Sequence, residues 1–162
     1  MKMQELCERI NVAPRQLKYL LEQGMIPPGV DPSPSTGHHR QLTLGQAYWL
    51  AVVLKLKQAG VAAPLASEIT NYAKRHLRGI TRNLNWDFQF SPFDGDLTSS
   101  FRWWVEIGDN ENIRLLTDGN PSREGIVYEF PWYRIAGNKE VPDPRPATCV
   151  RIDLTRIAEM LR

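Results

Sequence analysis

The chain has 162 residues, 42% of them hydrophobic and 23% charged, with a formal net charge of +2. This balance is typical of a soluble globular protein of one ordinary domain or two small ones. No apolar run approaches the roughly 20 residues that a membrane helix needs, and the charged residues near Met1 are not those of a signal peptide. We therefore expect a cytoplasmic protein with no membrane partner. Cys7 and Cys149 are the only cysteines, and they form no C-x-x-C pair, which argues against a disulfide framework or a structural zinc site.

The charge is unevenly distributed along the chain. Residues 1–78 hold ten Lys/Arg and five Asp/Glu, a net charge of +5. Residues 79–162 hold ten Lys/Arg and thirteen Asp/Glu, a net charge of −3. A basic half followed by an acidic half favours a polyanion-binding module joined to a part with another task, although a fluctuation of composition gives a similar difference.

Two short helices are predicted at the start of the chain. Apolar residues recur at helical spacing over residues 2–10, and Asn11 is a suitable stop. A second short helix follows, in which Pro14 suits the first turn and Gly24 suits a left-handed C-terminal cap. Two short helices joined by three or four residues form a helix-turn-helix.

The second helix has one apolar and one polar face. Its apolar face carries Leu17, Leu20 and Leu21. The opposite face presents four residues that suit a DNA major groove: Arg15, Gln16, Lys18 and Tyr19. Taken alone, this pattern favours an ordinary amphipathic surface helix over a DNA-binding one.

A polar loop rich in proline and serine covers residues 29–43, and its end, 37–42, is a candidate hairpin. His38, His39 and Arg40 at this hairpin would contact phosphate or enter the minor groove. Adjacent histidines without a nearby cysteine or carboxylate are weak evidence for a metal site.

Two longer helices follow. Thr43 and Gln46 form a capping box at the start of the first, which ends at Gly60 and has a broad apolar face. Pro64 opens the next helix, which we expect to end near Arg78 in a basic cluster that suits the helix dipole as well as a partner.

In this order the signals resemble the N-terminal domain of MerR-type transcriptional regulators, whose members carry a run like GVSPRTLRYYEERGLLPP. Residues 12–28 (VAPRQLKYLLEQGMIPP) are similar to that run. Residues 37–43 (GHHRQLT) are similar to a family wing of the type GYRRYT, with one extra residue, and residues 56–61 (LKQAGV) to a turn of the form lGf. The resemblance covers roughly residues 3–75.

The resemblance implies a winged helix-turn-helix that binds double-stranded DNA as a homodimer. Three positions depart from the family pattern: Lys18 stands where arginine is usual, and Leu20 and Leu42 replace tyrosines that often face the DNA backbone. The long C-terminal helix through which members dimerise is not predicted here, so dimerisation falls to the C-terminal half. The metal-sensing cysteines of some members are absent.

After Arg78 the pattern changes to that of a small antiparallel sheet. Residues 79–100 are expected to be a linker that becomes the first strand. Asp153 is a suitable N-cap for a terminal helix with Leu154, Ile157, Ala158 and Leu161 on one face. The tryptophan-rich composition favours a hydrophobic core over a dimer interface or a ligand pocket. Strands are predicted at residues 85–90, 101–107, 113–117, 125–130, 132–135 and 147–152.

The sequence therefore predicts an α+β protein. Residues 1–78 would form an all-helical winged helix-turn-helix domain, and residues 79–162 an antiparallel β domain with a terminal helix that serves dimerisation or effector binding. No motif of an enzyme, metal site or cofactor site is found. The favoured function is a DNA-binding transcriptional regulator. The alternatives are an architectural protein of a phage or mobile element (excisionase or packaging type) and a protein–protein adaptor on the same fold.

Overall fold

The computed structural model describes residues 1–26, 41–83, 97, 101–109, 112–118, 127–135, 139–141, 146 and 148–162. The predicted wing residues 37–40 and the predicted strand at 85–90 lie outside these ranges. So do most of the proline-rich segments.

The N-terminal half consists of helices, as predicted. They are α1 (Met3–Arg9), α2 (Pro14–Glu22), α3 (Leu44–Gln58) and α4 (Ala63–Asn83). Gly24 has a φ of 64°, which confirms the left-handed cap after α2. The expected end of α4 near Arg78 is wrong, because the helix runs through residues 79–83, where a linker was predicted. One glycine costs only about 1 kcal/mol inside a helix, and no proline follows to stop it.

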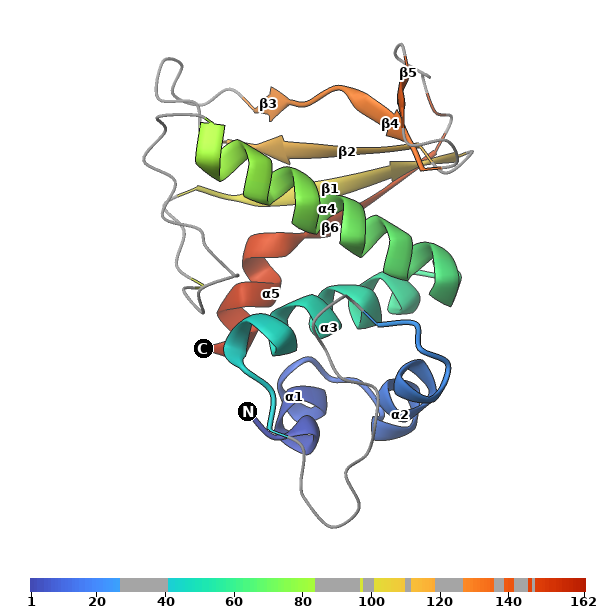
Figure 1. Ribbon diagram of the computed structural model, residues 1–162, viewed down its shortest axis with the longest axis vertical. Coiled ribbons are helices and arrows are strands. Elements are labelled where there is room, and N and C mark those ends of the chain that lie inside the picture. The colour runs from blue at the N-terminus through green and yellow to red at the C-terminus, as the bar shows by residue number, and fades with distance from the viewer. Residues whose placement is uncertain are drawn as a thin grey trace.

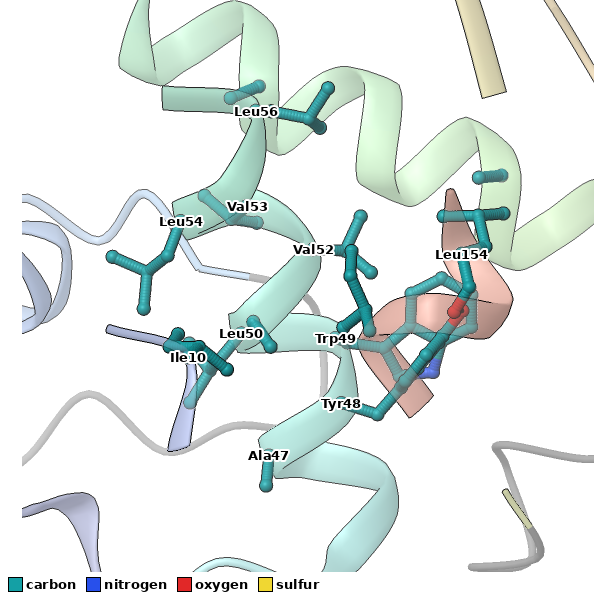
Figure 2. Close-up of a cluster of buried hydrophobic side chains, with 14 of the residues drawn as sticks. Ile10, Ala47, Tyr48, Trp49, Leu50, Val52, Val53, Leu54, Leu56 and Leu154 are labelled. Carbon is teal, nitrogen blue, oxygen red and sulfur yellow. Dashed lines mark hydrogen bonds between the residues drawn. The ribbon is translucent and has the colours of Figure 1, made fainter. Parts of the chain in front are cut away.

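The helix α3 lies at the centre of the helical half. Its predicted capping box is present: the Gln46 N–H donates to Thr43 Oγ1 (3.1 Å) and the Thr43 N–H to Gln46 Oε1 (2.9 Å). Every side chain from residue 47 to residue 54 is buried. One broad buried face was predicted for this helix from the sequence, whereas this stretch is buried all round. Helices that are apolar all round are covered on every side. Figure 2 shows Ile10 beside Leu50 on one side of α3, and Leu154 beside Tyr48 on the other.

The C-terminal half is an antiparallel sheet, as predicted. Its strands are β1 (Trp103–Gly108), β2 (Asn112–Thr117), β3 (Tyr128–Glu129), β4 (Trp132–Arg134), β5 (Lys139–Val141) and β6 (Cys149–Asp153). The order is β5-β4-β2-β1-β6, and β3 also pairs with β2. The expected hairpin is confirmed by the β1–β2 register, which pairs Trp103 with Thr117. The three-residue strand β5 was not predicted.

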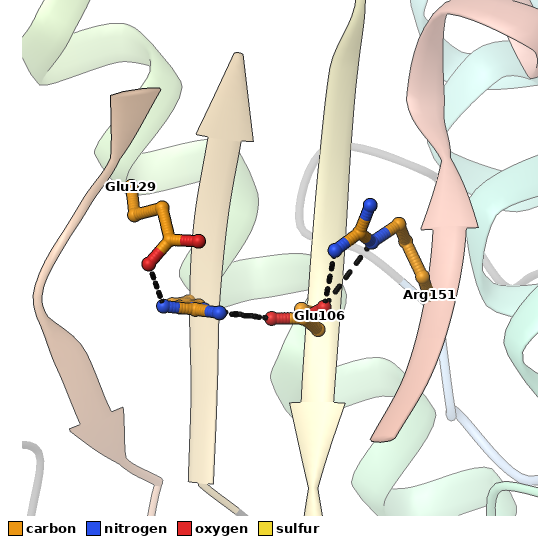
Figure 3. Close-up of polar contacts among 4 residues, drawn as sticks. Glu106, Glu129 and Arg151 are labelled. Carbon is orange, nitrogen blue, oxygen red and sulfur yellow. Dashed lines mark hydrogen bonds and ion pairs between the residues drawn. The ribbon is translucent and has the colours of Figure 1, made fainter. Parts of the chain in front are cut away.

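The two faces of the sheet differ in chemistry. One face carries buried apolar residues such as Trp103, Val105 and Leu115, and α4 crosses the sheet in Figure 1. The other face carries an ion-pair network. Glu106 of β1 pairs with Arg114 of β2 and with Arg151 of β6, and Figure 3 shows Glu106 beside Arg151.

The terminal helix α5 (Leu154–Leu161) joins the two halves. Asp153 caps it, as predicted, by accepting a hydrogen bond from the Arg156 N–H (2.8 Å). The expected apolar face of Leu154, Ile157, Ala158 and Leu161 is buried, and α5 packs against α3, α1 and β1. Buried residues of both halves belong to one hydrophobic cluster. The α+β class is confirmed, and the division at residue 78 stays a prediction.

Candidate nucleic-acid interface

The orientation of α2 is set by its apolar side. Leu17, Leu20 and Leu21 are all buried, as the helical spacing predicted. Pro14 occupies the first position of the helix, where a missing N–H costs no hydrogen bond. Since the leucines face the core, the residues between them are turned toward solvent.

The solvent side of α2 carries the four residues singled out from the sequence. Arg15, Lys18 and Tyr19 are exposed and share one face by their spacing of three and four residues. Among the described residues, Lys18 forms one ion pair, an exposed contact with Glu22 (3.7 Å). Gln16 is half-buried, and its Oε1 atom has no hydrogen-bond partner among the described residues. That Oε1 atom is buried, so this face offers the two cations and the exposed Tyr19 side chain.

The structure adds a fifth residue to this surface. Lys57, in the last turn of α3, places its Nζ 4.9 Å from the centre of the Tyr19 ring. A cation over an aromatic ring is held by the ring's negative face. The basic end of α3 is visible in the sequence, but its contact with α2 is decided by how the two helices pack.

The turn between α1 and α2 is fixed by side chains from α3. Lys55 Nζ donates to the Ile10 carbonyl (2.6 Å), and Gln58 Nε2 donates to the Asn11 carbonyl (2.9 Å). Asn11 itself has a φ of 52°, in the left-handed region. These contacts hold the two helices of the helix-turn-helix at one angle on α3.

The base of the predicted wing is anchored to the start of the chain. Gln41 forms a β-bridge with Lys2, and the Leu42 N–H donates to the Met1 carbonyl (2.9 Å). Leu42 is buried, so it packs in the core. His38, His39 and Arg40 lie outside the described residues, and their assignment stays a prediction.

The basic end of α4 is separate from this surface. His76 packs against two tyrosine rings that also touch each other, with its ring centre 4.0 Å from that of Tyr72 and 4.8 Å from that of Tyr133. Burial, and next the charge of Arg75, lower the pKa of His76. A neutral His76 therefore packs as a ring against the sheet and adds no charge to a DNA-binding face.

A hollow of about 500 Å³ lies between α1 and α2, lined in part by Met3, Leu17 and Cys7. Burial, and next the nearby charge of Glu8, raise the pKa of the Cys7 thiol. A thiol that stays protonated is a poor nucleophile, so Cys7 acts as a small buried hydrophobe.

Comparison with known families identifies the N-terminal part of the chain. Residues 1–73 match the family described as MerR HTH family regulatory protein. Residues 1–73 form a MerR-type helix-turn-helix domain. The family is one of DNA-binding regulators and is not an enzymatic family. No curated protein matches the chain.

The match ends within α4, and the sheet and α5 lie outside it. Two departures from the family pattern now have a structural explanation. Leu20 and Leu42 are 0% and 4% exposed, so both belong to the core of this domain. None of the helices in the described ranges is both long and apolar enough to cross a membrane.

Proposed function

We propose that this protein is a sequence-specific transcriptional regulator that binds double-stranded DNA as a homodimer. The observation that carries the proposal is the exposed cationic face of α2 on a MerR-type domain whose turn is clamped by Lys55 and Gln58. Such a regulator acts in the compartment that holds its DNA, which we propose is the cytoplasm.

The residues of α2 divide into two roles in this proposal. Arg15 and Gln16 lie near the N-terminus of the helix, the end from which recognition helices contact base edges. Arg15 is the exposed member of this pair, and Gln16 would need a side-chain rotation to present its amide to a base, because its Oε1 atom is buried. Lys18 and Tyr19, farther along the helix, would contact the phosphate backbone.

Lys57 would join Lys18 and Tyr19 on the backbone. Its ammonium group lies over the Tyr19 ring, so one phosphate could contact both side chains. His38, His39 and Arg40 complete the proposed interface from the sequence, at the wing. Phosphate contacts of this kind fix the register of a protein on the duplex but do not read its sequence.

A homodimer is part of the proposal because two-fold regulators bind half-sites about 34 Å apart or at multiples of that spacing. The C-terminal half would provide the dimer contact. In the described part of the chain, the only helix after the sheet is α5, and its apolar face is buried within its own subunit.

The test is DNA binding by fluorescence anisotropy, with a site selected from random duplexes by the wild-type protein. Arg15→Ala should weaken binding to that site by about 1–3 kcal/mol and relax the preference at one base position. Arg156→Ala is the matched control, because Arg156 is an exposed arginine on α5 and should leave binding unchanged.

Raising the salt concentration should weaken wild-type binding steeply, because cations on the protein displace counterions from the phosphates. The proposal fails if the wild type selects no sequence, or if Arg15→Ala and Arg156→Ala bind the selected site equally well.

A further inference from the structure

The strand β6 forms one edge of the sheet, and its main-chain groups point alternately inward and outward. Across the β1–β6 register, the Asp109 N–H donates to the Thr148 carbonyl (3.3 Å). Hydrogen-bonded and non-hydrogen-bonded pairs alternate along an antiparallel ladder. Thr148 and Val150 therefore bond toward β1, whereas the N–H and C=O groups of Cys149 and Arg151 point away from the sheet.

These outward groups are available for pairing. No hydrogen bond to the main chain of Cys149 or Arg151 is found in the part of the chain that the structure describes. The side chains of Cys149, Val150 and Arg151 are all exposed. Natural proteins usually guard such an edge with proline, lysine or a bulge, and β6 has no proline and no lysine.

The one charge in the exposed part of β6 is already neutralised on the sheet surface. Arg151 donates from Nε (3.1 Å) and Nη2 (2.7 Å) to Glu106 Oε1. Figure 3 shows this contact directed across the face of the sheet toward β1. The opposite edge strand, β5, is shorter and carries both Lys139 and Glu140.

Few other apolar surfaces remain for self-association. Among the described residues, the exposed large hydrophobic side chains are Tyr19, Val127 and Val150. Tyr19 belongs to the proposed DNA-binding face. The apolar face of α5 is occupied by its own subunit, with Leu161 only 2% exposed. Of the two valines, Val150 alone lies on an edge strand with unpaired main-chain groups.

We infer that β6 pairs antiparallel with β6 of a second copy of this chain, so that one continuous sheet crosses the dimer. The favoured register places Val150 opposite its own copy and pairs the outward main-chain groups of Cys149 with those of Arg151 of the second copy. This register buries both exposed valines and keeps the two arginines from lying directly opposite each other. The inference rests on the proposed homodimer and names its surface.

The first test is sedimentation equilibrium without DNA. Val150→Lys should weaken dimerisation by about tenfold or more, because it buries a charge beside the two-fold axis. Val127→Lys is the matched control, since Val127 and Val150 have similar exposed fractions of 40% and 36%. A circular dichroism melt of both variants checks that each is folded.

Cross-linking gives a second test, which leaves Val150 unchanged. Diagonal neighbours across an antiparallel pair lie about 7–8 Å apart, so a short bismaleimide should join the two Cys149 thiols. Cys149 is exposed and Cys7 is buried, so only the former should react in the folded protein. Cys149→Ser should abolish the cross-linked dimer and leave sedimentation unchanged.

The outcomes separate this inference from the proposed function. A wild type that is monomeric, or a Val150→Lys variant that dimerises like Val127→Lys, overturns the β6 interface. A Val150→Lys variant that loses tight binding to a two-half-site duplex, yet binds one half-site like the wild type, supports both proposals. If the wild type dimerises through β6 but selects no DNA sequence from the random duplexes, only the proposed function fails.

Discussion

Glu106 shows how a single buried carboxylate can join three strands. It is 5% exposed, and it accepts hydrogen bonds from Arg114 Nε (2.7 Å) and from two nitrogens of Arg151. Burial alone would raise the pKa of Glu106, but hydrogen bonds from Arg151 and Arg114 and their charges hold it below its usual value. Arg114 also pairs with Glu129 and lies over the Trp132 ring (4.6 Å).

Replacing this carboxylate should destabilise the sheet. Glu106→Gln removes the counter-charge of Arg151 and leaves Arg114 with Glu129 alone, and we expect a loss of roughly 2–4 kcal/mol in the free energy of unfolding. Glu159→Gln, which breaks an exposed pair with Arg156, should cost less than about 1 kcal/mol. Urea denaturation of both variants measures the difference, and equal costs would contradict the network's role.

The pH dependence of this effect has a defined sign. The folded-state pKa of Glu106 lies below its unfolded value. Its stabilising contribution is therefore fully present above about pH 4.3 and is lost as pH falls through the folded pKa. The stability gap between wild type and Glu106→Gln should narrow in that acidic range.

At the scale of elements, the helix-turn-helix depends on how its connections leave each helix. Gly24 and Gly60 follow α2 and α3 with positive φ values, as C-terminal caps commonly do. Asn11 takes a positive φ at the turn after α1, where asparagine is tolerated better than most residues with a Cβ. Its carbonyl is then placed to accept the hydrogen bond from Gln58.

The backbone at Asn11 can be tested by a pair of substitutions. Asn11→Ala should lower the free energy of unfolding by about 1 kcal/mol, because alanine is strained in the left-handed region. Asn11→Gly should be close to neutral, since glycine adopts this conformation freely. Chemical denaturation compares the two. If the Asn11→Ala and Asn11→Gly variants have the same free energy of unfolding, the left-handed turn is not present in solution.

At the scale of the whole molecule, α5 ties the sheet to the MerR-type domain. The Tyr48 hydroxyl donates to the Leu154 carbonyl (3.3 Å), and Arg9 Nη1 donates to the Leu161 carbonyl (2.6 Å). On the other side, Thr155 Oγ1 accepts from the Trp103 N–H (2.8 Å). Figure 1 shows the two chain ends close together at this junction. The two halves should therefore unfold as one unit.

Ile157→Ala tests this coupling. Ile157 is 3% exposed, and its truncation should cost about 2–5 kcal/mol. Far-UV circular dichroism reports mainly the helices. In a Trp49→Phe background, which removes the tryptophan of α3, tryptophan fluorescence reports sheet residues such as Trp103 and Trp132. We expect both signals to shift together to lower temperature. Glu159→Ala, on the exposed side of α5, is the control. Two separate transitions would show that the halves are independent.

Local sequence patterns were enough to predict much of the fold. Pro14, Gly24, the Thr43–Gln46 capping box and the Asp153 cap were each predicted from residue types whose preferences act over a few positions. The hairpin of β1 and β2 was predicted for the same reason. The end of α4 and the strand β5 were not, because Gly79 does not stop a helix and because three residues carry too little alternation to indicate a strand.

The sequence by itself determined the helix-turn-helix and its outward residues, because the leucine spacing of α2 leaves only one face for Arg15, Gln16, Lys18 and Tyr19. Only the tertiary structure decided which distant groups meet there. Lys57 reaches Tyr19, α5 packs on α3, and β6 lies at one edge of the sheet formed by the described strands. These contacts join residues far apart in the chain, and no local periodicity encodes their packing.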